Sequence, residues 1–269
     1  KINKKNVAAI GLSGQTLFHK PKGKYPFSIQ AGDPKIIANE CQINVVSDFR
    51  NDHIKLGGEG APLVPEFHQK IFSKKNTSVV VLNIGGISNF TYLDGKDNFY
   101  GSDCGPGNAL MDIYCQKFLN RPYDKNGAHA KNGEVHTPSL YKMLDHSFFR
   151  RRHPKSTGKE IFNIKFIPKI LLKKSSNDIL ATLTELTSVC IAKSLLSLKK
   201  KPDRVIVCGG GQKNNFLVSS IEKHIRMPLT SSNKYSFDPQ AIEAMAFGWM
   251  ARQRVLRNPL LVKKNRGLL

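Results

Sequence analysis

Hydrophobic, β-branched runs that end in glycine-rich turns recur along this chain of 269 residues. The strongest run is Val79–Ile84, which Gly85 and Gly86 turn into a second run at residues 87–93. A third run, Arg204–Cys208, leads into three consecutive glycines at residues 209–211. Short strands that alternate with tight turns and helical stretches are typical of an α/β fold.

Helical segments are expected between these strands. Asp33 followed by Pro34 marks a helix start, because aspartate caps helix N-termini and proline suits the first helical position. Residues 178–198 carry apolar side chains on two rows, which predicts a largely buried helix. A last helix is expected over residues 239–254, opened by Asp238. Two shorter strands are expected at residues 7–11 and 44–48.

The chain is long enough for two lobes, and a polar stretch just before Val79 suggests a boundary near residue 78. We expect a first lobe over residues 1–78, a second, nucleotide-binding lobe over residues 79–250, and a C-terminal helix and tail over residues 251–269.

Composition narrows the class of protein. Hydrophobic residues make up 40% of the chain, but the longest apolar runs are far too short to span a bilayer. No secretory signal opens the sequence. The five cysteines are widely scattered, which favours reduced thiols over a zinc site or a disulfide framework. We therefore expect a cytoplasmic protein without membrane contact.

The formal net charge of +22 raises nucleic acid as a partner. The basic residues, however, occur in short clusters, and most are not interleaved with aromatic residues. A general lysine bias on solvated faces is the preferred interpretation. An anionic substrate such as a nucleotide would benefit from the positive field in either case.

Three glycine-rich turns are candidates for chemistry. Gly85 and Gly86 could bring backbone N–H groups to an anion, although a hairpin needs glycine in any case. Asp103 is expected in a Gly-Pro-Gly loop at a helix start, where free N–H groups favour negative charge. It could act on a phosphate or a reacting hydroxyl, or merely cap a turn. The glycines at 209–211 could carry a flat nucleobase or ribose. Together, the three turns predict a nucleotide site with Asp103 as the best catalytic candidate.

Nine motifs, in order from residue 11 to about 252, resemble the anhydro-N-acetylmuramic acid kinase family. They are Gly14-Gln15-Thr16, Asp48-Phe49-Arg50 and the residues at 57–65, 83–87, 103–108, 154–158, 181–184, 209–211 and 243–247. The resemblance implies a two-lobed actin/hexokinase-like (ribonuclease H-like) ATPase fold that closes over ATP. It also implies a role in cell-wall recycling: 1,6-anhydro-N-acetylmuramic acid, ATP and water would give N-acetylmuramic acid 6-phosphate and ADP. Mg²⁺ would accompany ATP, and a homodimer is possible.

The resemblance also implies residue roles. Asp103 would be the general base that activates the attacking water, and Arg50, Glu243 and Gln15 would contact the sugar. Without the family match, Arg50 could equally form a surface ion pair and Glu243 a carboxylate on a helix face. The residues that would bind the nucleotide are Asn83, Gly85, Gly86, Gly105, Gly107, Asn108, Gly209, Gly210 and Gly211. Lys155, Ser156 and Thr157 would belong to the substrate lobe, with a plain basic loop as the rival interpretation. No side chain is assigned as a metal ligand.

The sequence departs from the family pattern in places. Family members open with a Gly-Thr-Ser-x-Asp-Gly phosphate loop, and none occurs in this chain, so we expect a truncated first lobe. Ser13 stands where histidine is usual and Glu59 where glutamine is usual; the first change could weaken a substrate contact. Two alternatives to the kinase remain: a non-catalytic relative that binds only sugar or nucleotide, and a basic nucleic-acid-binding protein.

Overall fold

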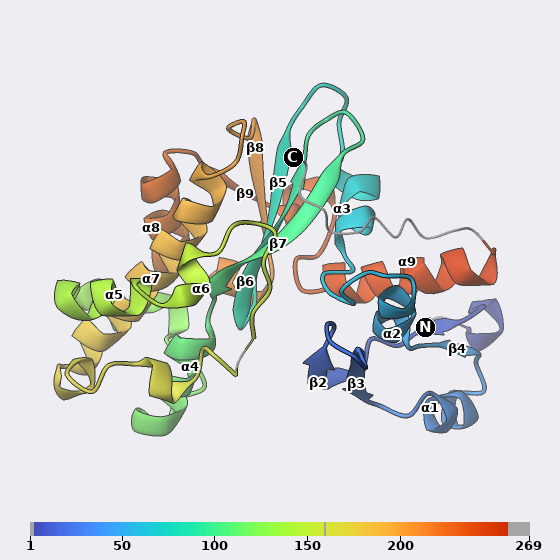
Figure 1. Ribbon diagram of the computed structural model, residues 1–269, viewed down its shortest axis with the longest axis horizontal. Coiled ribbons are helices and arrows are strands. Elements are labelled where there is room, and N and C mark those ends of the chain that lie inside the picture. Colours follow the sequence, from blue (N-terminus) through green and yellow to red (C-terminus); the bar gives the residue numbers. More distant parts are fainter. Residues whose placement is uncertain (1–2, 159, 258–269) are drawn as a thin grey trace. The chain divides into compact units, whose positions relative to one another are not determined.

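The computed structural model describes residues 3–158 and 160–257 (Figure 1). It divides into two compact units. The chain up to Ile71 and from Ala241 onward forms the first unit, and the chain from Phe72 to Gln240 forms the second. This division differs from the expected lobes chiefly at the C-terminal end. The second lobe was expected to extend to residue 250, whereas the second unit ends at Gln240 and the chain from Ala241 onward belongs to the first unit.

The second unit is built on a five-stranded sheet in the order β7-β6-β5-β8-β9. Its strands are β5 (Val79–Ile84), β6 (Ile87–Leu93), β7 (Phe99–Pro106), β8 (Arg204–Cys208) and β9 (Leu229–Ser231). The first three form an antiparallel meander, and β8 and β9 run parallel to β5. In chain order this is 3-2-1-4-5, with only the second strand reversed. The α/β class is confirmed, and the order is that of the ribonuclease H-like sheet implied by the resemblance.

Helices accompany this sheet in the second unit (Figure 1). They are α4 (Ala109–Phe118), α5 (Thr137–Leu144), α6 (Ser147–Arg150), α7 (Ser176–Leu196) and α8 (Asn215–Ile225). Helix α7 is central, since it packs against β6, β7, α4, α5 and α8. It is long and apolar enough to cross a membrane by length and composition, but 78% of its most apolar window is buried inside the protein. It is therefore a core helix, as the two apolar rows predicted.

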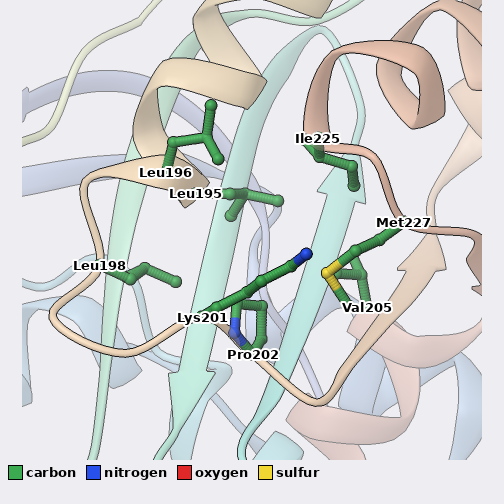
Figure 2. Close-up of a pocket in the computed structure, with 8 residues that line it drawn as sticks. All are labelled: Leu195, Leu196, Leu198, Lys201, Pro202, Val205, Ile225 and Met227. Carbon is green, nitrogen blue, oxygen red and sulfur yellow. The ribbon is translucent and has the colours of Figure 1, made fainter.

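The start of α7 lies two residues before the expected one. Ser175 caps it, because its side chain accepts a hydrogen bond of 3.1 Å from the Asp178 N–H. At the other end of the helix, Leu195 helps to line an apolar hollow of about 100 Å³. Figure 2 shows its side chain with those of Val205, Ile225 and Met227 around this hollow, which adjoins the start of β8 and the end of α8.

The first unit contains short strands and four α-helices in its described part. The strands are β1 (Ile10–Gly11), β2 (Gln15–Lys20), β3 (Phe27–Ala31) and β4 (Val45–Val46), and the helices are α1 (Pro34–Cys41), α2 (Phe49–Lys55), α3 (Pro65–Phe72) and α9 (Ile242–Val255). β1 pairs with β4 in parallel, and β2 pairs with β3 in an antiparallel hairpin. Helix α9 packs on β1, where a side chain at Gly11 would collide with the Phe247 carbonyl.

Two predicted helix starts have different outcomes. Asp33 caps α1 as predicted, since its Oδ1 accepts from the Lys35 N–H at 2.8 Å. The prediction that Asp238 opens the last helix is wrong. Its Oδ1 accepts from the Gln240 N–H at 2.9 Å and so closes a turn, and α9 begins only at Ile242.

Candidate active site

Asp103 lies within strand β7, so the prediction that it sits in a Gly-Pro-Gly loop is wrong. Pairing with β6 continues through this stretch: Asp103 lies opposite Asn89, and Pro106 lies opposite Ile87. An irregularity in the register between Ser88 and Asn89 accommodates the pairing. Proline is tolerated because Pro106 is the last residue of a strand at the end of the sheet order.

The start of α4 offers fewer free N–H groups than expected. The Gly107 and Ala109 N–H groups donate to the Gly86 carbonyl at 2.9 and 3.1 Å, and the Asn108 N–H donates to the Gly85 carbonyl at 2.8 Å. The hairpin at Gly85 and Gly86 thus caps the helix. A side chain at Gly107 would collide with the Gly85 carbonyl, so only glycine allows this close approach.

The same hairpin keeps donors of its own. Within the described residues, no backbone carbonyl outside the strand ladders accepts from the N–H groups of Gly85 or Gly86. Their carbonyls are held by α4, which fixes the orientation of the two peptide groups. A fixed turn with spare N–H groups is a chemically suitable place for an anion.

The three consecutive glycines have separate structural reasons. Gly209 has a φ of +82°, and a side chain there would collide with Asn83, while a side chain at Gly211 would collide with Ile84. Both glycines therefore let the turn pack on the end of β5. Around Gly210 there is open space, with no atom within 4 Å of the position that its Cβ would take. Gly210 is thus the one of the three that leaves backbone accessible to a ligand.

The side chain of Asn83 lies near both glycine turns. It is the last but one residue of β5, beside the ends of both the hairpin and β8. Its side-chain nitrogen lies 3.9 Å from where a Gly85 Cβ would be, and its side-chain oxygen borders Gly209. Gly105, by contrast, is buried in the sheet, where a Cβ would come within 2.9 Å of the Phe149 ring.

The carboxyl of Asp103 is largely buried under residues 153–158, here called the strap. The Thr157 N–H donates to Asp103 Oδ2 at 2.8 Å, and the Asp103 N–H donates to the Lys155 carbonyl at 2.9 Å. Burial raises the pKa of Asp103 to about 7, with a further rise from Glu160; the bond from Thr157 and the charge of Lys155 oppose it. An aspartate with a pKa near neutrality is suited to exchange a proton.

Polar groups around the strap hold it in place. Ser102 Oγ accepts from the Lys155 N–H at 2.9 Å and lies 2.6 Å from His153 Nδ1. The buried Lys155 ammonium donates to the Phe148 carbonyl at 3.2 Å and lies 4.5 Å above the centre of the Phe148 ring. Burial lowers the pKa of His153 to about 4, so its ring is neutral at pH 7. Sequence reasoning singled out the strap as a motif, but no local pattern connected it with Asp103.

The remaining predicted residues, Arg50, Gln15 and Glu243, belong to the first unit. Arg50 lies in α2 and donates from Nη1 to the Gly60 carbonyl at 3.0 Å, while its Nε is buried without a partner in the described structure. Burial lowers the pKa of Arg50, and the charge of Glu243 opposes this effect. Gln15 is the exposed first residue of β2, and Glu243 is exposed in the first turn of α9.

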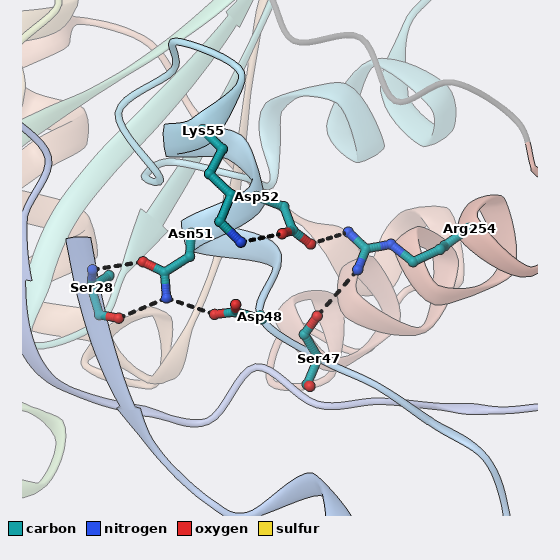
Figure 3. A network of polar contacts seen from close by, with 7 residues as sticks. All are labelled: Ser28, Ser47, Asp48, Asn51, Asp52, Lys55 and Arg254. Carbon is teal, nitrogen blue, oxygen red and sulfur yellow. Dashed lines mark hydrogen bonds and ion pairs between the residues drawn. The ribbon is translucent and has the colours of Figure 1, made fainter. Parts of the chain in front are cut away.

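Arg50 also lines a cavity of about 450 Å³ in the first unit. Ser13, Ser28 and Asp48 line it too, whereas Gln15 and Glu243 do not. Figure 3 shows part of its wall: the Asn51 amide binds the Ser28 backbone at 2.8 and 2.9 Å and Asp48 Oδ1 at 2.6 Å. This network holds the beginning of α2, and with it Arg50, against β3.

A family model described as anhydro-N-acetylmuramic acid kinase matches residues 1–268. A curated protein of that name from the gamma-proteobacterium EBAC31A08 is 46% identical to this chain, over all of this chain and 75% of that protein. The protein of that name from Pasteurella multocida is 42% identical over 95% of this chain and 69% of its own length. The one from a Sulfurovum species is 44% identical over 95% of this chain and 70% of its own length. Among solved structures, the activator of the 2-hydroxyisocaproyl-CoA dehydratase from Clostridium difficile with bound ADPNP covers 94% of this chain and 97% of its own at a TM-score of 0.47 and 12% identity. By the match of the family model and the identities to the curated proteins, the chain belongs to the anhydro-N-acetylmuramic acid kinase family.

Proposed function

We propose that this protein is an ATP-dependent sugar kinase. It adds water across the 1,6-anhydro bridge of 1,6-anhydro-N-acetylmuramic acid and phosphorylates O6, giving N-acetylmuramic acid 6-phosphate and ADP. The observation that carries the proposal is Asp103, a largely buried carboxyl with a pKa of about 7 in a chain that belongs to this kinase family. We further propose that the protein acts in the cytoplasm, in cell-wall recycling, and that it forms a homodimer.

In the first step, Asp103 takes a proton from a water molecule whose oxygen bonds to the anomeric carbon of the sugar. The bond from that carbon to O6 breaks, and the electron pair stays on O6. In the second step, O6 bonds to the γ-phosphorus of ATP, and ADP leaves. The bond from the Thr157 N–H to Oδ2 holds the carboxyl in one orientation, as a base must be held to act efficiently.

The glycine turns of the second unit would bind the nucleotide. The spare N–H groups of Gly85 and Gly86 suit the phosphates, with Asn83 beside them. Gly107 and Asn108 would contribute indirectly, because their N–H groups donate to the carbonyls of the hairpin. The buried Gly105 belongs to β7, the strand that leads to these two residues. The open backbone at Gly210 suits adenosine, while Gly209 and Gly211 let that turn pack.

Mg²⁺ would bind together with ATP and neutralise charge on the phosphates. Within the described residues, no group of three or more His, Cys, Asp or Glu side chains gathers in one place. In kinases, Mg²⁺ is commonly held by phosphate oxygens, water molecules and one or two carboxylates.

Arg50, Gln15 and Glu243 of the first unit would contact the sugar. The best supported is Arg50, because it lines a cavity and carries a buried nitrogen without a partner in the described structure. A guanidinium can bind the carboxylate or the oxygens of an acidic sugar through two N–H groups at once. Ser13, in the same cavity, is a shorter hydrogen-bonding group than the histidine that is usual at its position.

Release of ADP tests the proposal. Incubation of the protein with Mg-ATP should release ADP only when the anhydro sugar is added, and mass spectrometry should identify the 6-phosphate. Asp103→Asn should lower kcat by about a hundredfold or more, as removal of a general base does. Asp145→Asn is the matched control, because Asp145 is an exposed carboxylate of the same unit. Sugar or nucleotide binding without ADP release would instead favour a non-catalytic relative.

A further inference from the structure

The apolar hollow of the second unit lies away from the glycine turns. It adjoins the start of β8, whereas the turn at residues 209–211 follows the end of that strand (Figure 2). Two helices end beside it, since Leu195 and Leu196 close α7 and Ile225 closes α8. The hollow is therefore at the opposite end of β8 from the glycines assigned to the nucleotide.

The hollow is open to solvent and almost entirely aliphatic. Leu196 lines it and is 63% exposed. Apart from Lys201, the side chains around it are those of leucine, proline, valine, isoleucine and methionine (Figure 2). An exposed apolar surface with polar surroundings is typical of a place where another molecule binds.

The surroundings are strongly basic. Six exposed basic residues lie within two positions of a residue that lines the hollow, and together they are called the basic rim. They are Lys193, Lys199, Lys200, Lys201, Lys223 and Arg226. Among the described residues, only Lys200 of the six forms an ion pair, with Asp203 at 3.7 Å. Asp203 and Glu222, the acidic residues of these segments, each accept a backbone N–H at 2.7 Å, from Ser78 and Leu229. The rim thus keeps a positive charge that suits an acidic partner.

The size and lining of the hollow narrow the kind of partner. An apolar cavity of about 150 Å³ can take one benzene molecule, so a hollow of about 100 Å³ has room for roughly one aliphatic side chain. No aromatic side chain lines it on which a nucleobase could stack. A second copy of this chain would bring a second basic rim to a symmetric contact, and like charges oppose such a contact.

We propose that the hollow and the basic rim form a docking site for an acidic segment of another protein. One aliphatic side chain of that segment enters the hollow between the ends of α7 and α8. Carboxylates on either side of it pair with the lysines of the rim. The inference does not depend on the proposed function, because none of these residues is assigned to the sugar or the nucleotide.

Methionine methyl signals of the full chain test the site by NMR, because Met227 lines the hollow whereas Met111 is buried in α4. The probe is the peptide Glu-Asp-Glu-Leu-Glu-Asp-Glu at low salt. It should shift the Met227 signal and leave that of Met111 in place, with a Kd of about 1 mM or below, as expected for one buried leucine and a few exposed ion pairs. The same peptide with serine in place of leucine should bind about tenfold more weakly. A Met227 signal that stays in place, or that responds equally to both peptides, overturns the proposal.

Substitutions at exposed positions test the same contacts from the side of the protein. Leu196→Glu should weaken binding of the leucine peptide about tenfold, and Lys201→Glu about fivefold. Ile170→Glu and Lys142→Glu are the matched controls, because both residues are exposed in the same unit and neither lines the hollow. The controls should keep the wild-type affinity, and all four variants the wild-type melting temperature. Equal weakening by the controls would mean that the peptide responds only to net charge, which refutes the site.

Other occupants give different results. Phosphatidylserine vesicles and an oligothymidylate are the competing probes, and neither should depend on Leu196. If Leu196→Glu lowers the affinity for either probe tenfold, the hollow binds lipid or nucleic acid and the proposal fails. If the same variant turns a dimer into a monomer in analytical ultracentrifugation, a second copy covers the hollow and the proposal fails as well. Release of ADP plays no part in these outcomes, so failure of the proposed function would leave the docking site standing.

Discussion

Asp103 combines an anchored carboxylate oxygen with a raised pKa, and its protonation state should therefore control the rate. Burial raises the pKa of this group to about 7, far above that of a solvated aspartate. A general base must be deprotonated, so activity should be present above pH 7 and fall about tenfold per unit as the pH drops below it. The measurement is kcat/KM for the sugar between pH 5 and pH 9. A profile that is flat down to pH 5 would contradict this assignment.

Glu160 should tune the same titration. Its side chain folds back onto Gly158 of the strap, and its negative charge raises the pKa of Asp103. In Glu160→Gln this repulsion is lost, so the acid limb of the pH profile should move to lower pH. Because Glu160 is exposed, we expect a shift of only a few tenths of a pH unit. Glu134→Gln, an exposed change elsewhere in the unit, should leave the profile unmoved; a shift to higher pH in Glu160→Gln would refute the explanation.

At the scale of elements, the glycines of the turn after β8 have two different roles, one in packing and one in ligand binding. Gly209→Ala should destabilise the protein by about 2 kcal/mol, because the new side chain meets Asn83 in a left-handed conformation. Gly210→Ala enters open space and should change the free energy of unfolding by less than about 0.5 kcal/mol. Chemical denaturation measures both values.

Gly210→Ala also tests whether the nucleotide binds at this turn. If adenosine lies on the Gly210 backbone, Gly210→Ala should raise the KM for ATP while stability stays near that of wild type. Equal destabilisation by the two substitutions would show that Gly210 is a packing glycine like its neighbours. An unchanged KM for ATP would show that adenosine does not bind at this turn.

Local patterns were sufficient for some elements. The strands β5, β6 and β8 follow from β-branched runs bounded by glycine, and the cap of α1 follows from Asp33 next to Pro34. In each case the residues that define the element are neighbours in the sequence. The prediction of an α/β fold rested on these elements and is confirmed.

Other features depend on contacts between distant parts of the chain. β7 continues through Asp103 and Pro106 because β6 offers a partner along its whole length, which overrides the local preference of glycine and proline for a loop. Thr157 meets Asp103 across 54 positions of sequence. No periodicity signals such a contact, so the contact of the strap with Asp103, and with it the raised pKa of Asp103, could be recognised only in the structure.

At the scale of the whole molecule, the two units have very different cores. The second unit contains a large cluster of buried side chains around α7 and the sheet. In the described part of the first unit, one cluster of buried side chains consists of Phe49, Phe247, Met250 and Ala251, with a few half-buried neighbours. Several large apolar side chains of the first unit are exposed, among them Leu17 at 67% and Tyr25 at 70%. Since burial of apolar surface is the main source of stability, the first unit should be the less stable one.

Trp249 makes this difference measurable. It is the only tryptophan of the chain and lies in α9 of the first unit, with its ring centre 5.9 Å from that of Phe67. Its fluorescence therefore reports on the first unit, whereas far-UV circular dichroism is dominated by the longer helices of the second, above all α7. In a urea titration, the fluorescence midpoint should fall at a lower concentration than the circular dichroism midpoint. Trp249→Phe serves as the control, since it should abolish the fluorescence transition and leave the later circular dichroism transition in place. Coincident midpoints would mean that the two units unfold as one cooperative structure, with a stability that neither core determines alone.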